Sequence, residues 1–168
     1  MKISIDVFDP DSIDKAIKKL EDYSKGLERK AQELCERLTM MGATNVSMLF
    51  SQLIYTGPVD IEISVETLEE NKYAIIASGE TVLIAEFGAG LIGGGHPDPQ
   101  LNGQPMGPGT YPDAKGHWDD TSGWWLPREK TDGHAVHTYG NPPTMAMYNT
   151  AQDLRKEIQR VAQEVFRQ

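Results

Sequence analysis

The stretch 88–140 most constrains what this chain can fold into, because it leaves little room for long helices or strands. It holds twelve of the sixteen glycines and six of the ten prolines. Glycine weakens regular elements, and proline removes a backbone hydrogen-bond donor. Connections longer than about 12–15 residues without structure of their own are uncommon in compact domains, and they are functional or disordered. We therefore expect an extended arm here, which contacts with other protein molecules could hold in an ordered conformation.

Aromatic residues of this arm are the candidates for such contacts. Aromatic side chains are enriched at the centres of protein interfaces. The same side chains can instead fold back on their own subunit as a small satellite core, and both arrangements are consistent with the sequence. The candidates are Tyr111, Trp118, Trp124 and Trp125.

Before the arm, the sequence predicts one long helix over about 10–41. Asp9 and Pro10 are typical of an N-cap and a first helical position, and Gly42 is typical of the residue after a helix end. Such a helix extends about 48 Å at 1.5 Å per residue, so either Gly26 kinks it or part of it projects toward a partner. An amphipathic helix lying on a sheet explains the same pattern. The apolar side of the helix advances in steps of four and three: Ile13, Ile17, Leu20, Ser24, Leu27, Ala31, Leu34, Leu38 and Met41.

The remaining segments predict a sheet over about 43–87 and a helix over about 142–166. Short connections between the strands favour an antiparallel meander of about four strands. Asn141 and Pro142 are expected to start the second helix. The expected fold class is α+β, in a single domain over residues 1–168, with a short strand or an ordered lead-in near residues 3–7. The expected meander strands are 43–55, 60–66, 73–77 and 81–87.

Charge and composition exclude several classes of protein. The net charge of -9 and the pI of about 4.9 disfavour a conventional DNA-binding module and binding to an anionic membrane. The single cysteine, Cys35, rules out an internal disulfide and fits synthesis in a reducing compartment. No apolar run approaches the roughly 20 residues that span a bilayer, and the N-terminus lacks a signal-peptide pattern. We expect a soluble protein made in a cytoplasm.

The sequence contains one weak metal motif and one candidate acid or base. His134 and His137 have HxxH spacing, which suggests a small metal-dependent hydrolase that uses them with acidic residues of the arm. The other candidate ligands in the arm are His96, His117, Asp98, Asp113, Asp119 and Asp120. Glycines on both sides make a helix unlikely there, and residues three apart on a strand point to opposite faces. Glu86 is a candidate general acid or base, but a structural carboxylate that accepts hydrogen bonds from loop amides is favoured.

No other catalytic pattern is present. The glycines at 88–95 match neither a dinucleotide fingerprint nor a P-loop, and no serine lies in a nucleophile elbow. We therefore assign no catalytic residue, no cofactor and no metal, and we expect the protein not to be an enzyme. The hydrolase is the alternative, and a host-targeting toxin of a phage or mobile element is a third hypothesis.

Several segments together resemble the minor tail-component, or tail-completion, family of long-tailed bacteriophages and prophages. They are IAEFGAG at 84–90, GTYP at 109–112, GWW at 123–125 and HTYGNPPTMAMYNTAQDLRKEI at 137–158. The resemblance implies a virion protein of the neck, in a ring of six identical subunits that joins the head to the tail. Its implied partners are neighbouring neck, tail-terminator or tail-tube proteins. Genomic DNA would pass through the ring without sequence-specific binding.

The resemblance also implies which residues build the subunit and its contacts. The arm adds Gly94, Tyr111 and Trp118 as candidates, and the insertion at 90–109 goes beyond the family pattern. Apart from the resemblance, the charges of Glu62, Glu66, Glu69 and Glu70 give the sheet an acidic edge, which is either an ordinary solvated face or a surface that avoids adhesion to a polyanion. The implied framework and interface residues are Glu86, Phe87, Gly88, Gly90, Trp124, Trp125, Gly140, Pro142 and Tyr148.

Overall fold

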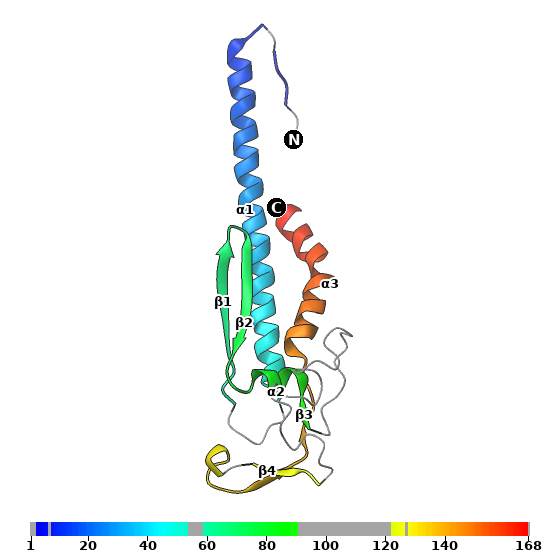
Figure 1. Cartoon of the computed structure of the whole chain (residues 1–168). Coiled ribbons are helices and arrows are strands. Elements are labelled where there is room, and N and C mark those ends of the chain that lie inside the picture. Colours follow the sequence, from blue (N-terminus) through cyan, green and yellow to red (C-terminus); the bar gives the residue numbers. More distant parts are fainter. Residues whose placement is uncertain (1–2, 7, 54–58, 91–121, 127, 168) are drawn as a thin grey trace.

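Two long helices and a β-hairpin form the body of the protein in a computed structural model (Figure 1). The structure describes residues 3–6, 8–53, 59–90, 122–126 and 128–167. Helix α1 (Pro10–Phe50) extends along most of the molecule. Helix α3 (Ala146–Arg167) and the hairpin of β1 (Glu62–Glu69) and β2 (Lys72–Ser78) lie beside its C-terminal half. The expected α+β class is confirmed.

Helix α1 begins as predicted but does not end at Gly42. The Asp9 side chain accepts a hydrogen bond from the Asp11 amide at 3.0 Å, which caps the first turn. The predicted strand at 43–55 is wrong, because residues 43–50 continue the helix. Gly42 is instead a close-packing position within α1. A Cβ atom there would lie 2.5 Å from Ile75 Cδ1 and 2.9 Å from Leu154 Cδ1, so glycine lets β2 and α3 both approach the helix.

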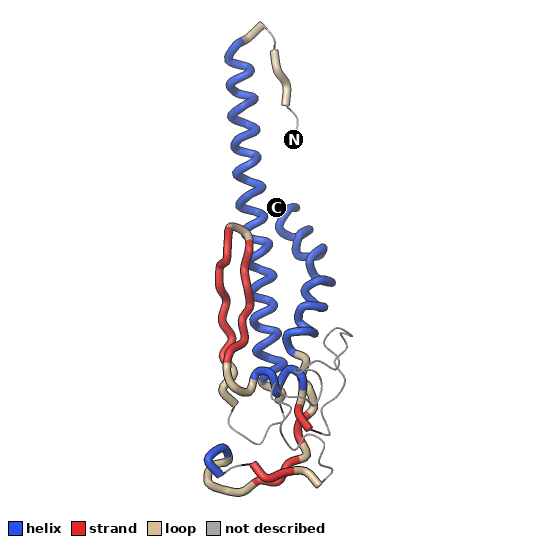
Figure 2. Tube along the Cα trace, viewed as in Figure 1, coloured by secondary structure: helices blue, strands red, loops and turns tan. Residues whose placement is uncertain are grey.

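The hairpin is the part of the predicted meander that forms. Strands β1 and β2 pair antiparallel, with Ile63 opposite Ala77 and Val65 opposite Ile75. Asn71, at φ 59°, lies in the turn between them. The described residues contain three two-stranded sheets and no four-stranded meander. Figure 2 shows that the other short strands lie beyond the C-terminal end of α1.

The predicted strand at 81–87 is also wrong, because Val82–Phe87 is the short helix α2. Asp60 holds the start of this helix: its carboxylate accepts hydrogen bonds from the Glu80 amide at 2.6 Å and the Thr81 amide at 3.0 Å. Ala85 and Glu86 are buried against the rest of the protein. A short apolar run is compatible with a buried strand or a buried helix, so its pattern alone does not separate the two.

The main core lies where α1, α2, α3 and the hairpin meet, which we call the core end. Its buried members are Val46, Phe50, Ala85 and Ala146, with Ile63, Ile75 and other partly buried residues around them. Val161 and Val165 are buried farther along α3. Val46 and Phe50 are one helical turn apart, which explains why Met48 between them is exposed.

Helix α3 starts later than predicted and runs antiparallel to α1 (Figure 1). Asn141 belongs to strand β6 (Gly140–Asn141) and is not the N-cap of α3. At the other end, the Lys30 Nζ donates a hydrogen bond to the Phe166 carbonyl at 3.4 Å. Residues of α1 before Lys30 extend past the end of α3, and we call this part the projecting end.

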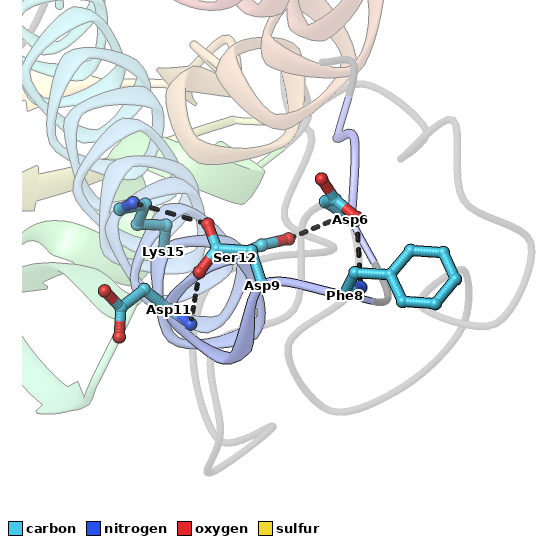
Figure 3. A network of polar contacts seen from close by, with 6 residues as sticks. All are labelled: Asp6, Phe8, Asp9, Asp11, Ser12 and Lys15. Carbon is cyan, nitrogen blue, oxygen red and sulfur yellow. Dashed lines mark hydrogen bonds and ion pairs between the residues drawn. The ribbon is translucent and has the colours of Figure 1, made fainter.

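Residues 3–6 turn back beside the projecting end (Figures 1 and 3). These four residues form no strand, so of the two expectations for this segment only the lead-in remains. The Asp6 amide donates to Ser12 Oγ at 2.6 Å, and the Phe8 amide donates to Asp6 Oδ1 at 3.0 Å. Lys15 Nζ lies 4.0 Å from Asp9 Oδ2. Among the described helices, none has the length and apolar character that crossing a membrane requires.

Candidate assembly site

The EFGAG and GNPPTMAMY segments meet at the N-terminus of α3. Glu86, only 6% exposed, lies at the meeting point. Its Oε2 accepts a hydrogen bond from the Met147 amide at 2.9 Å, and its Oε1 accepts one from the Tyr148 amide at 3.0 Å. The first amides of a helix generally lack a carbonyl acceptor one turn earlier, and a carboxylate at this end is also favoured by the helix dipole. Glu86 is therefore a helix cap supplied from α2.

This geometry agrees with the predicted structural role of Glu86 but changes its partners. The expected donors were loop amides. The observed donors belong to α3, which lies far along the chain. Both carboxylate oxygens already accept a hydrogen bond. This arrangement makes Glu86 part of the framework of the site.

The same region supplies hydrogen-bond donors to the carbonyl groups at the C-terminal end of α2. The Thr144 amide and hydroxyl both donate to the Ala85 carbonyl, at 2.8 and 2.9 Å. Asn141 Nδ2 donates to the Ile84 carbonyl at 3.0 Å, and Asn141 is only 3% exposed. Sequence reasoning assigned Asn141 to the wrong helix and did not identify Thr144. The two helix ends therefore satisfy each other's unpaired backbone groups.

Glycines allow the two segments to approach this closely. Gly88 is buried at φ 77°, and a Cβ there would lie 2.8 Å from both the Asn141 carbonyl oxygen and the Pro143 nitrogen. Strand β3 (Ala89–Gly90) then pairs with β6, which places Gly90 opposite Gly140. Pro142 follows β6 and is exposed. The structure thus brings together most of the framework residues that the resemblance implied.

The remaining aromatic candidates lie on a second hairpin. Strands β4 (Trp124–Leu126) and β5 (Val136–Thr138) pair antiparallel, with Trp125 opposite His137. The turn between them contains the short helix η2 (Arg128–Lys130). The ring of His137 lies 5.0 Å from that of Trp125 and 5.0 Å from that of Tyr139, both edge-on. Trp125 is 65% exposed and Tyr139 is 51% exposed.

We call Trp125, His137 and Tyr139 the aromatic patch. Trp124 alternates with Trp125 along β4 and is half-buried, as are Phe87 at the end of α2 and Tyr148 in the first turn of α3. The patch lies beyond the core end of the molecule, where Figure 1 shows β4. Trp125 is therefore largely exposed in the single chain.

Other candidate residues lie outside the described part of the chain. These are Gly94, Tyr111 and Trp118, together with His96, His117, Asp98, Asp113, Asp119 and Asp120 of the suggested metal site. His134 is exposed in the turn before β5, and His137 packs between aromatic rings. Within the described residues, no group of three or more histidine, cysteine, aspartate or glutamate side chains is placed to hold a metal ion.

Comparisons with protein-family models, curated proteins and solved structures find no match. The phage resemblance therefore rests on the quoted segments themselves. The arrangement of surfaces supplies an independent argument about function.

Proposed function

We propose that this protein is a structural subunit of the neck of a tailed phage. In this role it is a tail-completion or head–tail connector component, in a ring of six copies that joins the DNA-filled capsid to the tail. One observation carries the proposal beyond the resemblance: a single subunit leaves large apolar side chains exposed at both ends of its long axis. Trp125 and Tyr139 are exposed beyond the core end, and Ile13, Ile17 and Leu20 are about half exposed at the other. Contiguous patches of this kind mark interaction sites.

The core end is built to present the aromatic patch in a defined direction. Strand β5 leads through Tyr139 into β6, and β6 is paired with β3. The following chain enters α3, whose first amides are held by Glu86. A patch connected in this way to the main core supports contacts of fixed geometry. A ring requires that geometry, because each subunit must contact the next through the same pair of surfaces.

The charge of the chain is compatible with DNA passing beside it. Glu62, Glu66 and Glu70 are exposed on the β1–β2 hairpin, and the whole chain has a net charge of -9. A surface that lacks excess positive charge gains little from counterion release by phosphate contacts. This supports a passage that DNA crosses without being held.

Substituting Trp125 in the phage or prophage that encodes the chain tests this role. We expect Trp125→Ala to give filled heads and free tails that fail to join, as counted by electron microscopy. Trp125→Phe is the matched control, since it keeps an aromatic ring, and it should restore most joined particles. Because the side chain is largely exposed, the purified Ala variant should keep the wild-type unfolding temperature. Normal infectious particles from Trp125→Ala would contradict the proposed interface.

A deletion of residues 93–109, a part of the arm outside the described residues, tests the contribution of that part. We expect a folded protein that no longer supports joining of tails to filled heads. Normal assembly and infection by the deletion phage would exclude arm contacts as the basis of joining.

The metal-dependent hydrolase remains the alternative prediction. Elemental analysis of the purified protein checks it, since that enzyme would retain zinc, manganese or iron in a stoichiometric amount. Loss of the metal on substituting both His134 and His137 by alanine would then support the hydrolase.

A further inference from the structure

The β1–β2 hairpin has an unpaired strand edge on its outer side. Within the described residues, β1 pairs only with β2, so this sheet has two strands. Figures 1 and 2 show β1 on the side of the hairpin away from α1. In an antiparallel pair, every second residue of each strand directs its backbone N–H and C=O groups away from the partner strand. The outer side of β1 therefore presents backbone donors and acceptors to a further strand.

Strand β1 lacks most of the features that prevent an edge strand from pairing. Natural edges are blocked by proline, by short length, by bulges or by charged side chains, above all lysine. β1 has eight residues without a proline, and its one irregularity lies between Thr67 and Glu69, next to the turn. The register with β2 is regular over residues 62–67. Over this stretch, acidic charge is the one blocking feature, and it acts only on strands that are not basic.

The inner face of β1 is only partly covered by its own subunit. Ile75 of β2 lies over α1, because its Cδ1 is 2.5 Å from the position of a Cβ on Gly42. Val65, opposite Ile75 on β1, is 46% exposed. Helix α1 therefore supports β2 more fully than β1. A strand added beside β1 would contact the exposed side of Val65.

The outer face of β1 carries a spaced pair of carboxylates. Side chains alternate between the faces of a strand, so Glu62, Ser64 and Glu66 share the outer face. Glu69, nearer the turn, lies 3.4 Å from Lys72. Glu62 and Glu66 are exposed, and neither forms an ion pair with another described residue. Two uncompensated negative charges on either side of Ser64 therefore mark this face.

We propose that β1 accepts an additional strand from a partner protein, and that this strand carries lysine or arginine at two positions four residues apart. The basic side chains then face Glu62 and Glu66, and apolar side chains on the other face of the strand lie beside Val65. Opposite charges on neighbouring strands stabilise their pairing, and like charges destabilise it. Backbone hydrogen bonds supply the affinity in strand addition, and alternate side chains supply the specificity.

The same charges disfavour a second copy of β1 as the added strand. In an antiparallel register centred on Ser64, Glu62 of each copy faces Glu66 of the other. These like-charge pairs have no compensating basic side chain on β1. The charge pattern of the edge therefore selects a basic strand of a different sequence.

This inference concerns the hairpin and does not rest on the neck role. The charges of Glu62 and Glu66 repel the phosphates of passing DNA and attract a basic strand, so the two proposals are compatible. The Trp125 experiment and those below measure different surfaces. Either proposal can therefore fail without the other.

Nuclear magnetic resonance of the full-length chain with a synthetic peptide tests the added strand. The probe is the capped heptapeptide Val-Lys-Val-Ser-Val-Lys-Val, whose lysines are four residues apart. We expect it to shift the amide signals of residues 62–67 in a saturable way and to leave those of η2 unchanged. Val-Val-Ser-Lys-Lys-Val-Val has the same composition and controls for charge alone. Absence of shifts over residues 62–67, or equal binding of both peptides, would overturn the proposal.

Charge reversal on β1 tests the role of the carboxylates. We expect Glu66→Lys to raise the dissociation constant of the probe by about three- to tenfold, because an attraction becomes a repulsion. The same variant should bind a peptide with glutamate in place of both lysines more tightly than the wild type does. Glu129→Lys, at an exposed residue of η2, is the matched control and should change neither constant. Equal effects of the two substitutions would overturn the proposed site.

Two N-methylated forms of the probe test the backbone hydrogen bonds. One form is methylated at the valines, and the other at the lysines and the serine, so each lacks N–H donors along one edge. Since only one edge can face β1, we expect one form to bind and the other to lose binding. Equal dissociation constants for the two forms would overturn strand addition. If the free protein sediments as a dimer that Glu66→Lys disrupts or strengthens, a second copy occupies the edge, which would also overturn the proposal.

Discussion

At the scale of single residues, Glu86 joins two helix ends that are far apart in the sequence. Its carboxylate accepts the Met147 and Tyr148 amides, and neighbouring groups of α2 accept donors from Thr144 and Asn141. Buried amides that lose an acceptor remain unsatisfied, which is more costly than the net gain from one hydrogen bond. This residue is therefore a sensitive position for the whole core end.

We expect Glu86→Gln to lower the free energy of unfolding by about 1–3 kcal/mol, because the glutamine amide nitrogen cannot accept a hydrogen bond from a backbone amide. Chemical denaturation at neutral pH measures this change. Glu129→Gln, at an exposed residue of η2, is the control and should change stability by less than about 0.5 kcal/mol. Equal effects of the two substitutions would show that Glu86 does not hold α3.

Two glycines are expected to respond to alanine in opposite directions. Gly88 has φ 77° and close backbone neighbours, so Gly88→Ala should destabilise the protein by more than about 1–2 kcal/mol. Gly26 lies within α1 with no atom near the added Cβ, so Gly26→Ala should stabilise it by about 0.5–1 kcal/mol. Thermal unfolding of both variants measures the contrast. A stabilising Gly88→Ala would contradict the close approach of the EFGAG and GNPP segments.

At the scale of elements, Asp60 links the start of the β1–β2 hairpin to the start of α2. Hydrogen bonds from the Thr81 hydroxyl and from the amides of Glu80 and Thr81 lower the pKa of Asp60 to about 2. The depressed pKa means that the charged form is favoured by folding. Its stabilising effect is fully present above the ordinary pKa of 3.8 and is lost as the pH falls toward about 2.

We therefore expect Asp60→Asn to reduce the pH dependence of unfolding in this window. The difference in stability between wild type and variant should be largest above about pH 4 and should shrink as the pH approaches about 2. Urea denaturation at a series of pH values measures the difference. A gap that stays constant over this range would show that the carboxylate does not hold α2 through its charge.

The helices and strands also show where a local sequence pattern is sufficient to identify an element and where it is not. The β1–β2 hairpin was predicted because its turn and alternation are local. Helix α2 was predicted as a strand, because an apolar run of this length is compatible with either element when both faces are covered. Gly42 was predicted to end α1, yet it lies inside the helix, and only the positions of Ile75 and Leu154 show why a side chain is excluded there.

At the scale of the whole molecule, α1 is one helix in two environments. Its C-terminal half is packed against α3 and the hairpin, and its N-terminal half projects beyond them (Figure 1). Most helical stability in proteins comes from packing of an amphipathic face. The two halves should therefore differ in local stability unless a second molecule covers the projecting end.

Hydrogen exchange is expected to reveal this difference. At low protein concentration, the amides of residues 14–28 should exchange faster than those of residues 38–50. Mass spectrometry of peptides from each half measures both rates. Equal exchange rates in the two halves would contradict this difference in local stability.

The sequence by itself determined the helical repeat of α1, the β1–β2 hairpin, the α+β class and the acidic charge. These features depend on residues that are near one another along the chain, or on composition alone. Only the tertiary structure decided that Glu86 caps α3, that Asn141 donates a hydrogen bond to α2, and that α1 continues through Gly42. Each of these depends on contacts between segments distant in sequence, whose proximity no local pattern records.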